Sequence, residues 1–407
     1  MSGPIFDLQF ADLFATTLTL LLSVYPIWLP ILLIVVFWNL WLDYIRTEYI
    51  SEQQFVLLEI KLPKEITKSP AAMEIFYTAL YQTGSATFFE TYWKGKVRPW
   101  FSLEMTSFGG QVHFFIWTWE KFRNLIEAQL YAQYNNIEIF EVPDYTTSMV
   151  IDPVNHPLWI TQYKLIAPDP YPIKTYIDYG LDRDPKEEFK IDPITSVIEY
   201  LGSLTRGEQV WIQIMIQAHK KEGFSEGRII KKSDWKEGAM AEIKKIRDAS
   251  VQGDSKFPNP TKGQQEKIAA IERSIQKWPF EVMIRGGYFA TKEANQISKR
   301  ISGLIGAFRQ YSANDFNGFK LGEFTDYDFP WQDFRRIRRN AREREALDAY
   351  KKRSFFNPPY KHYRGKPFIL NTEELATIYH FPGQVSSTPT FERIMSKKAE
   401  PPANLPI

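Results

Sequence analysis

The chain has 407 residues, with 50 Lys and Arg, 48 Asp and Glu, 5 His and no Cys. This length suits two or three domains, and an apolar fraction of 44% is enough to form buried cores. The lack of Cys excludes disulfides, Cys-ligated zinc, iron–sulfur clusters and thiol catalysis, and a net charge of +2 provides no overall positive field for nucleic acid.

An uncharged stretch of 30 residues covers positions 13–42. About 20 apolar residues cross a bilayer core, so we expect one transmembrane helix, an anchor over residues 13–44. Aromatic residues suited to an interfacial belt follow near its end: Trp38, Trp41 and Tyr44. The basic residues after the stretch favour a single-pass protein of the inner (cytoplasmic) membrane, with the N-terminus outside and the bulk of the chain cytoplasmic.

Residues 55–145 predict a first ferredoxin-like domain, because strand and helix patterns follow in the order βαββαβ. The expected strands are residues 55–61, 100–107, 111–118 and 137–142. One expected helix starts near Ser69 and Pro70 and a second covers residues 120–134.

The same order recurs in residues 158–322, so we expect a second ferredoxin-like domain and a tandem repeat. Strands are expected at residues 158–166, 209–219, 279–288 and 318–321, with helices after Asp192 and over residues 294–310. A charge-rich, helical insert covers residues 220–277 of this domain. The insert either contacts a partner or packs as a solvated excursion on its own domain. The predicted fold class is therefore α+β.

The remaining tail, residues 323–407, shows no strand alternation and is expected to be irregular and helical. Residues 334–353 hold nine Lys and Arg against three acidic residues. The candidate contacts for nucleic acid or lipid in this run are Arg335, Arg336, Arg338 and Arg339. DNA phosphates, anionic lipid headgroups and an acidic partner all suit such a run, and a solvated helix face is the simpler alternative.

The sequence contains no phosphate-binding loop of the form G-x-x-x-x-G-K-[ST] and no G-x-G-x-x-G, so we expect neither an ATPase nor a dinucleotide cofactor. The five His lack the spacing of metal ligands, and no metal is expected. Ser225 lies in a G-x-S-x-G match, but the strand-to-helix turn that a hydrolase needs is missing, which favours a flexible turn. The aromatic strand near Phe114 lacks the basic residue and second glycine of RNA-recognition modules.

Several stretches resemble a largely uncharacterised, membrane-anchored family of candidate-phylum bacteria, which is similar to the region before the motor domain of FtsK/HerA-like and type IV secretion coupling ATPases. The matching segments are residues 69–77 (SPAAMEIFY), 125–134, 269–285, 308–320 and 368–406 (FILNTEELATIYHFPGQ…), of which the last is the most specific. In the fused relatives a segment like residues 373–382 leads into the ATPase core. Residues 1–407 contain no such core, so we expect either that the motor is another polypeptide or that the function has diverged.

The resemblance implies a DNA-transfer or secretion context. We therefore expect a non-enzymatic, membrane-anchored scaffold that docks a separate FtsK/HerA-like ATPase through residues 368–407, with self-association as an open possibility. The apolar anchors expected to bind that partner are Leu375, Ile378, Tyr379 and Phe381. The alternative is a nucleic-acid-binding module at the membrane that uses the basic run.

Overall fold

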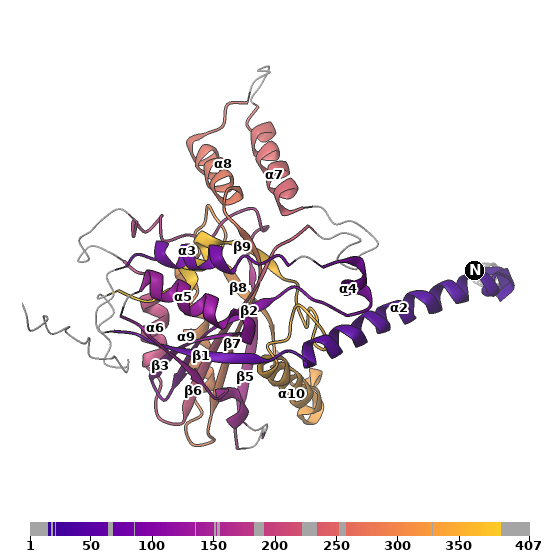
Figure 1. Cartoon of the computed structure of the whole chain (residues 1–407), viewed down its shortest axis with the longest axis horizontal. Helices are drawn as coiled ribbons and strands as arrows, with labels where there is room; N and C mark the ends of the chain where they lie inside the picture. Colours follow the sequence, from indigo (N-terminus) through magenta and orange to yellow (C-terminus); the bar gives the residue numbers. More distant parts are fainter. Residues whose placement is uncertain are drawn as a thin grey trace, which may run out of the picture.

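The computed structural model of the chain describes residues 15–17, 19–20, 22–63, 68–84, 86–134, 136–149, 152, 155–182, 191–221, 234–251, 258–327 and 329–383. It is a mixed α+β structure in which a long N-terminal helix projects from a body built on a large antiparallel sheet (Figure 1).

Helix α2 (Tyr25–Ser51) starts with a proline in its first turn and runs for 27 residues. At 1.5 Å per residue it is about 40 Å long, which exceeds the ~30 Å hydrocarbon core of a bilayer. Its apolar side chains point outward, and Ile34, Phe37 and Leu40 are each more than 60% exposed. Within the described residues, α2 is the one helix long and apolar enough to cross a membrane. It extends past the predicted end at residue 44, because its last turns pack against the body.

The first half of the sheet follows the predicted order of elements. Its strands are β1 (Phe55–Lys61), β2 (Trp100–Phe108), β3 (Gln111–Trp119) and β4 (Glu138–Val142). Its helices are α3 (Ala71–Leu80), the short α4 (Phe88–Tyr92), which was not predicted, and α5 (Arg123–Gln133). The strands lie in the order β4-β1-β3-β2, with every neighbouring pair antiparallel.

The second half repeats this arrangement. Its strands are β5 (Leu158–Leu165), β6 (Glu208–Ala218), β7 (Pro279–Ala290) and β8 (Phe319–Phe324), and its helices are α6 (Ile194–Gly202) and α9 (Ile297–Gly306). The strands lie in the order β6-β7-β5-β8, again with antiparallel neighbours. The predicted strands and helices of both halves are present, with small differences in their ends.

The two halves meet edge to edge. β2 pairs with β6 in an unbroken antiparallel register from Trp100 opposite Gln217 to Phe108 opposite Gln209. One sheet therefore runs through the whole body, and the strands at its centre have no free edge.

Both faces of this sheet are covered, so β7 is buried along its whole length and β6 at every residue except the partly buried Gln209. Helices α3, α5, α6, α9 and the C-terminal α11 (Thr372–Ile378) pack on one face over an extensive apolar core. Helix α10 (Ile337–Lys351) and the aromatic side chains after it cover parts of the other face.

The insert forms two helices, α7 (Trp235–Ala249) and α8 (Lys262–Ile275), which stand side by side at one end of the body (Figure 1). They share a small core of their own: Ala239, Ile243, Ile268 and Ile271. The two helices agree with the prediction of a helical insert.

The structure of the tail differs from the sequence prediction in one respect. Residues 368–371 form a strand, β9 (Phe368–Asn371), which pairs with the start of β7 from Pro279 to Val282. The prediction of a tail without strands was wrong here because four residues buried on both sides show no alternation. Helix α11 follows directly, so β9 and α11 are integral parts of the sheet and its core.

Candidate functional site

The place where α2 enters the body is closely packed. Trp41 donates its indole N–H to the carbonyl oxygen of Tyr92 at 3.0 Å, and Leu42, Ile45 and Tyr92 form a small buried cluster. One turn further along, the ring of Tyr49 lies 6.2 Å from that of Trp119 at the end of β3. The helix is thus fixed to α4 through Tyr92 and to the sheet through Trp119.

A cavity of about 490 Å³ opens beside this joint. One wall is aromatic: Phe55 stacks on Trp117 with 4.4 Å between ring centroids, and Trp100 lies 5.9 Å from Phe55. Another part of the wall comes from the segment after α10 and carries Lys352 and Arg353. Its size lies in the range of small-molecule sites, and its walls combine aromatic rings with charged side chains of both signs, since Asp144 also lines it.

A buried ion pair lies next to this cavity. Arg353 binds Glu104 of β2 through two bonds, Nε to Oε1 at 3.0 Å and Nη2 to Oε2 at 3.1 Å, and it also pairs with Asp144. Three further side chains donate hydrogen bonds to Glu104: Ser102 at 2.6 Å, Tyr145 at 2.8 Å and Gln213 at 3.1 Å.

The charges of this group stabilise one another. Burial alone lowers the pKa of the Arg353 guanidinium, but Glu104 outweighs burial and raises this pKa well above its usual value. For the Asp144 carboxyl, burial acts to raise the pKa, but the bonds to Arg353 outweigh burial, so that this pKa lies below its usual value. Arg353 and Asp144 are therefore stabilised in their ionised forms, and the group links β2 to the chain after α10. Sequence reasoning missed it, although a glutamate inside an apolar strand was a visible signal.

Arg285 of β7 lies next to this group and is fully buried. Its guanidinium donates to the carbonyl oxygens of Ala349 at 2.9 Å and Ser354 at 2.8 Å and to Gln213 at 3.3 Å. Burial lowers its pKa to about 9. Arg285 therefore holds the end of α10 on the sheet through backbone oxygens.

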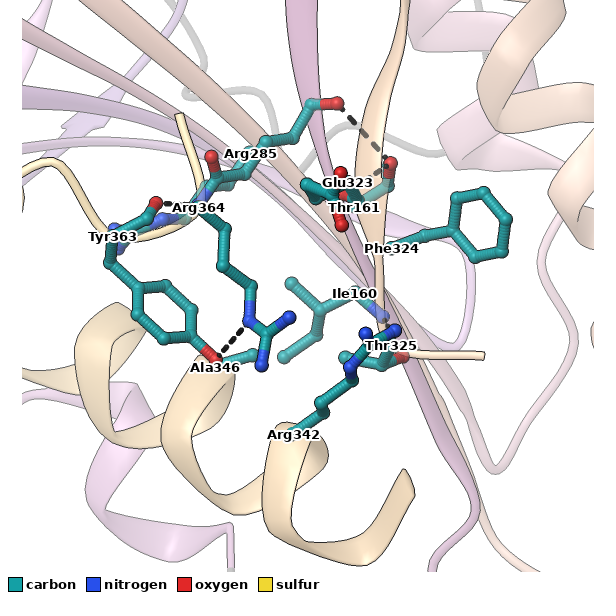
Figure 2. Close-up of a pocket in the computed structure, with 11 residues that line it drawn as sticks. Ile160, Thr161, Arg285, Glu323, Phe324, Thr325, Arg342, Ala346, Tyr363 and Arg364 are labelled. Atoms are coloured by element: carbon teal, nitrogen blue, oxygen red, sulfur yellow. Dashed lines mark hydrogen bonds between the residues drawn. The ribbon is translucent and has the colours of Figure 1, made fainter. Parts of the chain in front are cut away.

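Figure 2 shows a second, much smaller space next to Arg285, between Thr161 and Phe324 on one side and Arg342 of α10 and Arg364 on the other. Its volume is about 20 Å³, which is room for about one water molecule. The space is too small to hold a substrate or a cofactor.

A cavity of about 830 Å³ lies between the start of α7, the end of β6 and β9. His219 lies on its wall, with Nδ1 3.1 Å from Glu281 and Nε2 3.4 Å from Asp234. Lys220 and Lys366 also line it. No group of three or more His, Asp or Glu side chains within the described residues is arranged to hold a metal ion.

The four side chains predicted to bind a partner are inside the body. Leu375, Ile378 and Tyr379 are fully buried and Phe381 is 1% exposed. Tyr379 accepts a hydrogen bond from Tyr77 at its carbonyl oxygen and donates one to the carbonyl oxygen of Phe115. In this structure they contact the chain's own core and offer no surface to another protein. Their apolar spacing reflects packing of α11 on the sheet.

The basic run is divided. Arg335, Arg336 and Arg338 are exposed at the start of α10, whereas Arg339 pairs with Asp326 at 2.9 Å and with Glu343 at 2.7 Å. Beside the exposed arginines three apolar side chains also face outward: Trp331, Phe334 and Ile337. Ser225 and its G-x-S-x-G match lie outside the described residues.

A family model described as a domain of unknown function (DUF8128) matches residues 45–393, and the chain therefore belongs to this family. No curated protein matches the chain.

Proposed function

We propose that this member of the DUF8128 family is a non-enzymatic, membrane-anchored scaffold of a type IV secretion-like or DNA-translocation assembly, which docks a separate FtsK/HerA-like ATPase. The observation that carries the proposal is the packed joint between α2 and the body, where Ile45 of α2 is buried against Tyr92 of α4 and Tyr49 contacts Trp119 of β3. A platform has to hold its partners at a fixed orientation to the membrane, which a packed joint provides and a flexible linker does not.

The architecture of the sheet supports a platform as well. We interpret each half as a ferredoxin-like unit, because the strand orders β4-β1-β3-β2 and β8-β5-β7-β6 follow the same pattern. The pairing of β2 with β6 couples the two units, so that a load on one is transmitted through backbone hydrogen bonds to the other.

The orientation in the membrane is part of the proposal. Arg46, Lys61 and Lys68 follow the apolar stretch, and positive charge after a single span favours the cytoplasmic side. The body would then lie in the cytoplasm at the inner membrane, where an ATPase has access to nucleotide.

The docking segment inferred from the sequence covers residues 368–407, but β9 and α11 within it are buried and therefore leave only its later residues to contact a partner. These elements attach the segment to the body, since Asn371 and Glu374 form a capping box that starts α11 inside the core. We therefore assign the ATPase contact to residues 384–407, which follow the buried part.

The test is co-purification from native membranes. The full-length protein should enrich a polypeptide with a Walker A motif, and a chain that stops after Gly383 should lose it. A chain in which residues 384–407 are scrambled is the matched control and should also lose it. Equal recovery with all three chains, or no such ATPase with the full chain, contradicts the proposal. Deletion from Phe368 onward is not informative because it removes part of the core.

A second function is favoured by the exposure of three arginines at the start of α10. Arg335, Arg336 and Arg338 would contact DNA phosphates at the membrane. Replacing all three by Ala should reduce the slope of log affinity against log salt by roughly 2–3, since each phosphate contact contributes about 0.9. Absence of DNA binding by the full-length protein at low salt excludes this function.

A further inference from the structure

Helix α4 presents an unusual surface for so short an element. It has a complete capping box, in which Thr87 and Glu90 bond each other's backbone N–H groups, so five residues suffice for a defined helix. Phe88, Phe89 and Trp93 on and next to it are 50–56% exposed. Large aromatic side chains seldom gather on a water-facing surface without a binding role.

The helix is fixed against α2. Tyr92 is 2% exposed, and its ring centroid lies 5.3 Å from that of Trp38. The backbone carbonyl oxygen of Tyr92 accepts the hydrogen bond from the indole N–H of Trp41. Just after the helix, Gly95 has φ +63° and approaches the backbone of α2 so closely that a Cβ would lie 2.2 Å from the oxygen of Ile45. A side chain at this position would force the two segments apart.

The contacts of Tyr92 and Gly95 with α2 fix the position of α4 along the axis of α2. Tyr92 contacts α2 from Trp38 to Ile45, and Asp43 within this interval is the first charged residue after the apolar stretch. If α2 spans a bilayer, this interval is the boundary between acyl chains and headgroups. Figure 1 shows α4 beside α2 where the helix leaves the body.

We propose that α4 is an interfacial membrane helix that inserts Phe88, Phe89 and Trp93 into the boundary between headgroups and acyl chains of the bilayer that α2 crosses. The inference rests on the proposed membrane anchoring. The occupant is lipid because Tyr92 of α4 packs on Trp38 of α2, and the residues close to Trp38 along α2, Phe37 and Leu40, are themselves exposed apolar side chains. Aromatic rings prefer this boundary, and Lys94, which is exposed beside Trp93, would face anionic headgroups.

This arrangement deepens the function of the anchor. A single helix can rotate and tilt in a bilayer, whereas a second contact to one side of it restricts both motions. With α4 in the interface and α2 packed on the sheet, the body has one orientation relative to the membrane plane.

The lack of Cys makes the test direct. Single variants Phe89→Cys, Trp93→Cys, Phe37→Cys and Met240→Cys of the full-length protein are labelled with a nitroxide and placed in nanodiscs of phosphatidylethanolamine and phosphatidylglycerol. Collision rates with oxygen, which concentrates in lipid, and with a water-soluble nickel chelate are then compared for each label.

We expect oxygen collisions to dominate at positions 89 and 93, as at position 37, whereas the nickel chelate dominates at position 240 on α7. Chelate-dominated collisions at positions 89 and 93 with a lipid signal at position 37 overturn the inference and leave the membrane anchor intact. Chelate-dominated collisions at position 37 as well overturn the anchor itself.

Discussion

Glu104 and Arg353 form a fully buried, two-pronged ion pair that joins the centre of the sheet to the segment after α10. The residues are 249 positions apart in the chain, so the pair links the first half of the body to the C-terminal region. The aromatic-lined cavity next to α2 depends on this link, because Arg353 forms part of its wall.

Replacing Glu104 by Gln should destabilise the protein by about 3 kcal/mol, since it leaves Arg353 buried with a weakened partner. The matched control is Glu127→Gln, which breaks a pair with Arg123 in which both side chains are about a third exposed, and it should cost about 0.5 kcal/mol or less. The measurement is the denaturant dependence of unfolding of the full-length protein in detergent. Equal effects of the two variants would show that the buried pair does not stabilise the fold.

The stability should depend on pH through Glu374. Burial raises the pKa of this carboxyl to about 8, so the folded state keeps a proton that the unfolded state releases near its ordinary pKa of 4.5. The favourable contribution is therefore present at low pH and is lost as the pH rises from about 5 to about 8. The midpoint of thermal unfolding should fall over this range.

Glu374→Gln should flatten that pH dependence. Glu373 also has a raised pKa from burial, so part of the slope remains. The control is Glu208→Gln: burial acts to raise the pKa of Glu208, but bonding to Arg300 outweighs it and lowers this pKa to about 2. Its contribution is lost only in acid, so this variant should lower the midpoint evenly between pH 5 and pH 8. An unchanged slope in Glu374→Gln would show that Glu374 is ionised in the folded state.

Gly95→Ala should separate α4 from α2. Its Cβ would meet the backbone of Ile45 and Arg46, and overpacking of this kind costs about 1–3 kcal/mol in addition to the strain of a positive φ. Gly180→Ala is the matched control, because Gly180 has φ +70° with nothing within 4 Å of its Cβ, and it should cost about 1 kcal/mol. Thermal midpoints of both variants give the comparison, and similar losses would argue against a close contact between the loop and α2.

Leu375→Ala and Ile378→Ala should each destabilise the body by about 3 kcal/mol, as expected for apolar side chains removed from a core. Met240→Ala, at a side chain that is 60% exposed on α7, should change stability by about 0.5 kcal/mol or less. Unfolding curves test this directly. If both core variants keep full stability, these side chains are free to serve a partner, as the sequence prediction had it.

Much of the fold could be predicted from the sequence because its signals act over a few residues. The apolar stretch predicted α2, alternation predicted most strands, and the start signal at Ser69 and Pro70 predicted α3. Helix α4 was missed because its five residues make little more than one helical turn, which is too short to show a repeated apolar spacing. The burial of Tyr379 was missed because a helix that packs on its own body has the same apolar spacing as one that docks on a partner.

The sequence by itself therefore determined the long apolar helix, the mixed α+β class and the repeated order of strands and helices, since each depends on local periodicity. Only the tertiary structure decided that β2 pairs with β6, that β9 and α11 belong to the core, and that Glu104 meets Arg353. Strand edges pair through backbone groups that every residue carries, and contacts over long separations depend on where whole elements pack. Neither leaves a periodic mark in the sequence.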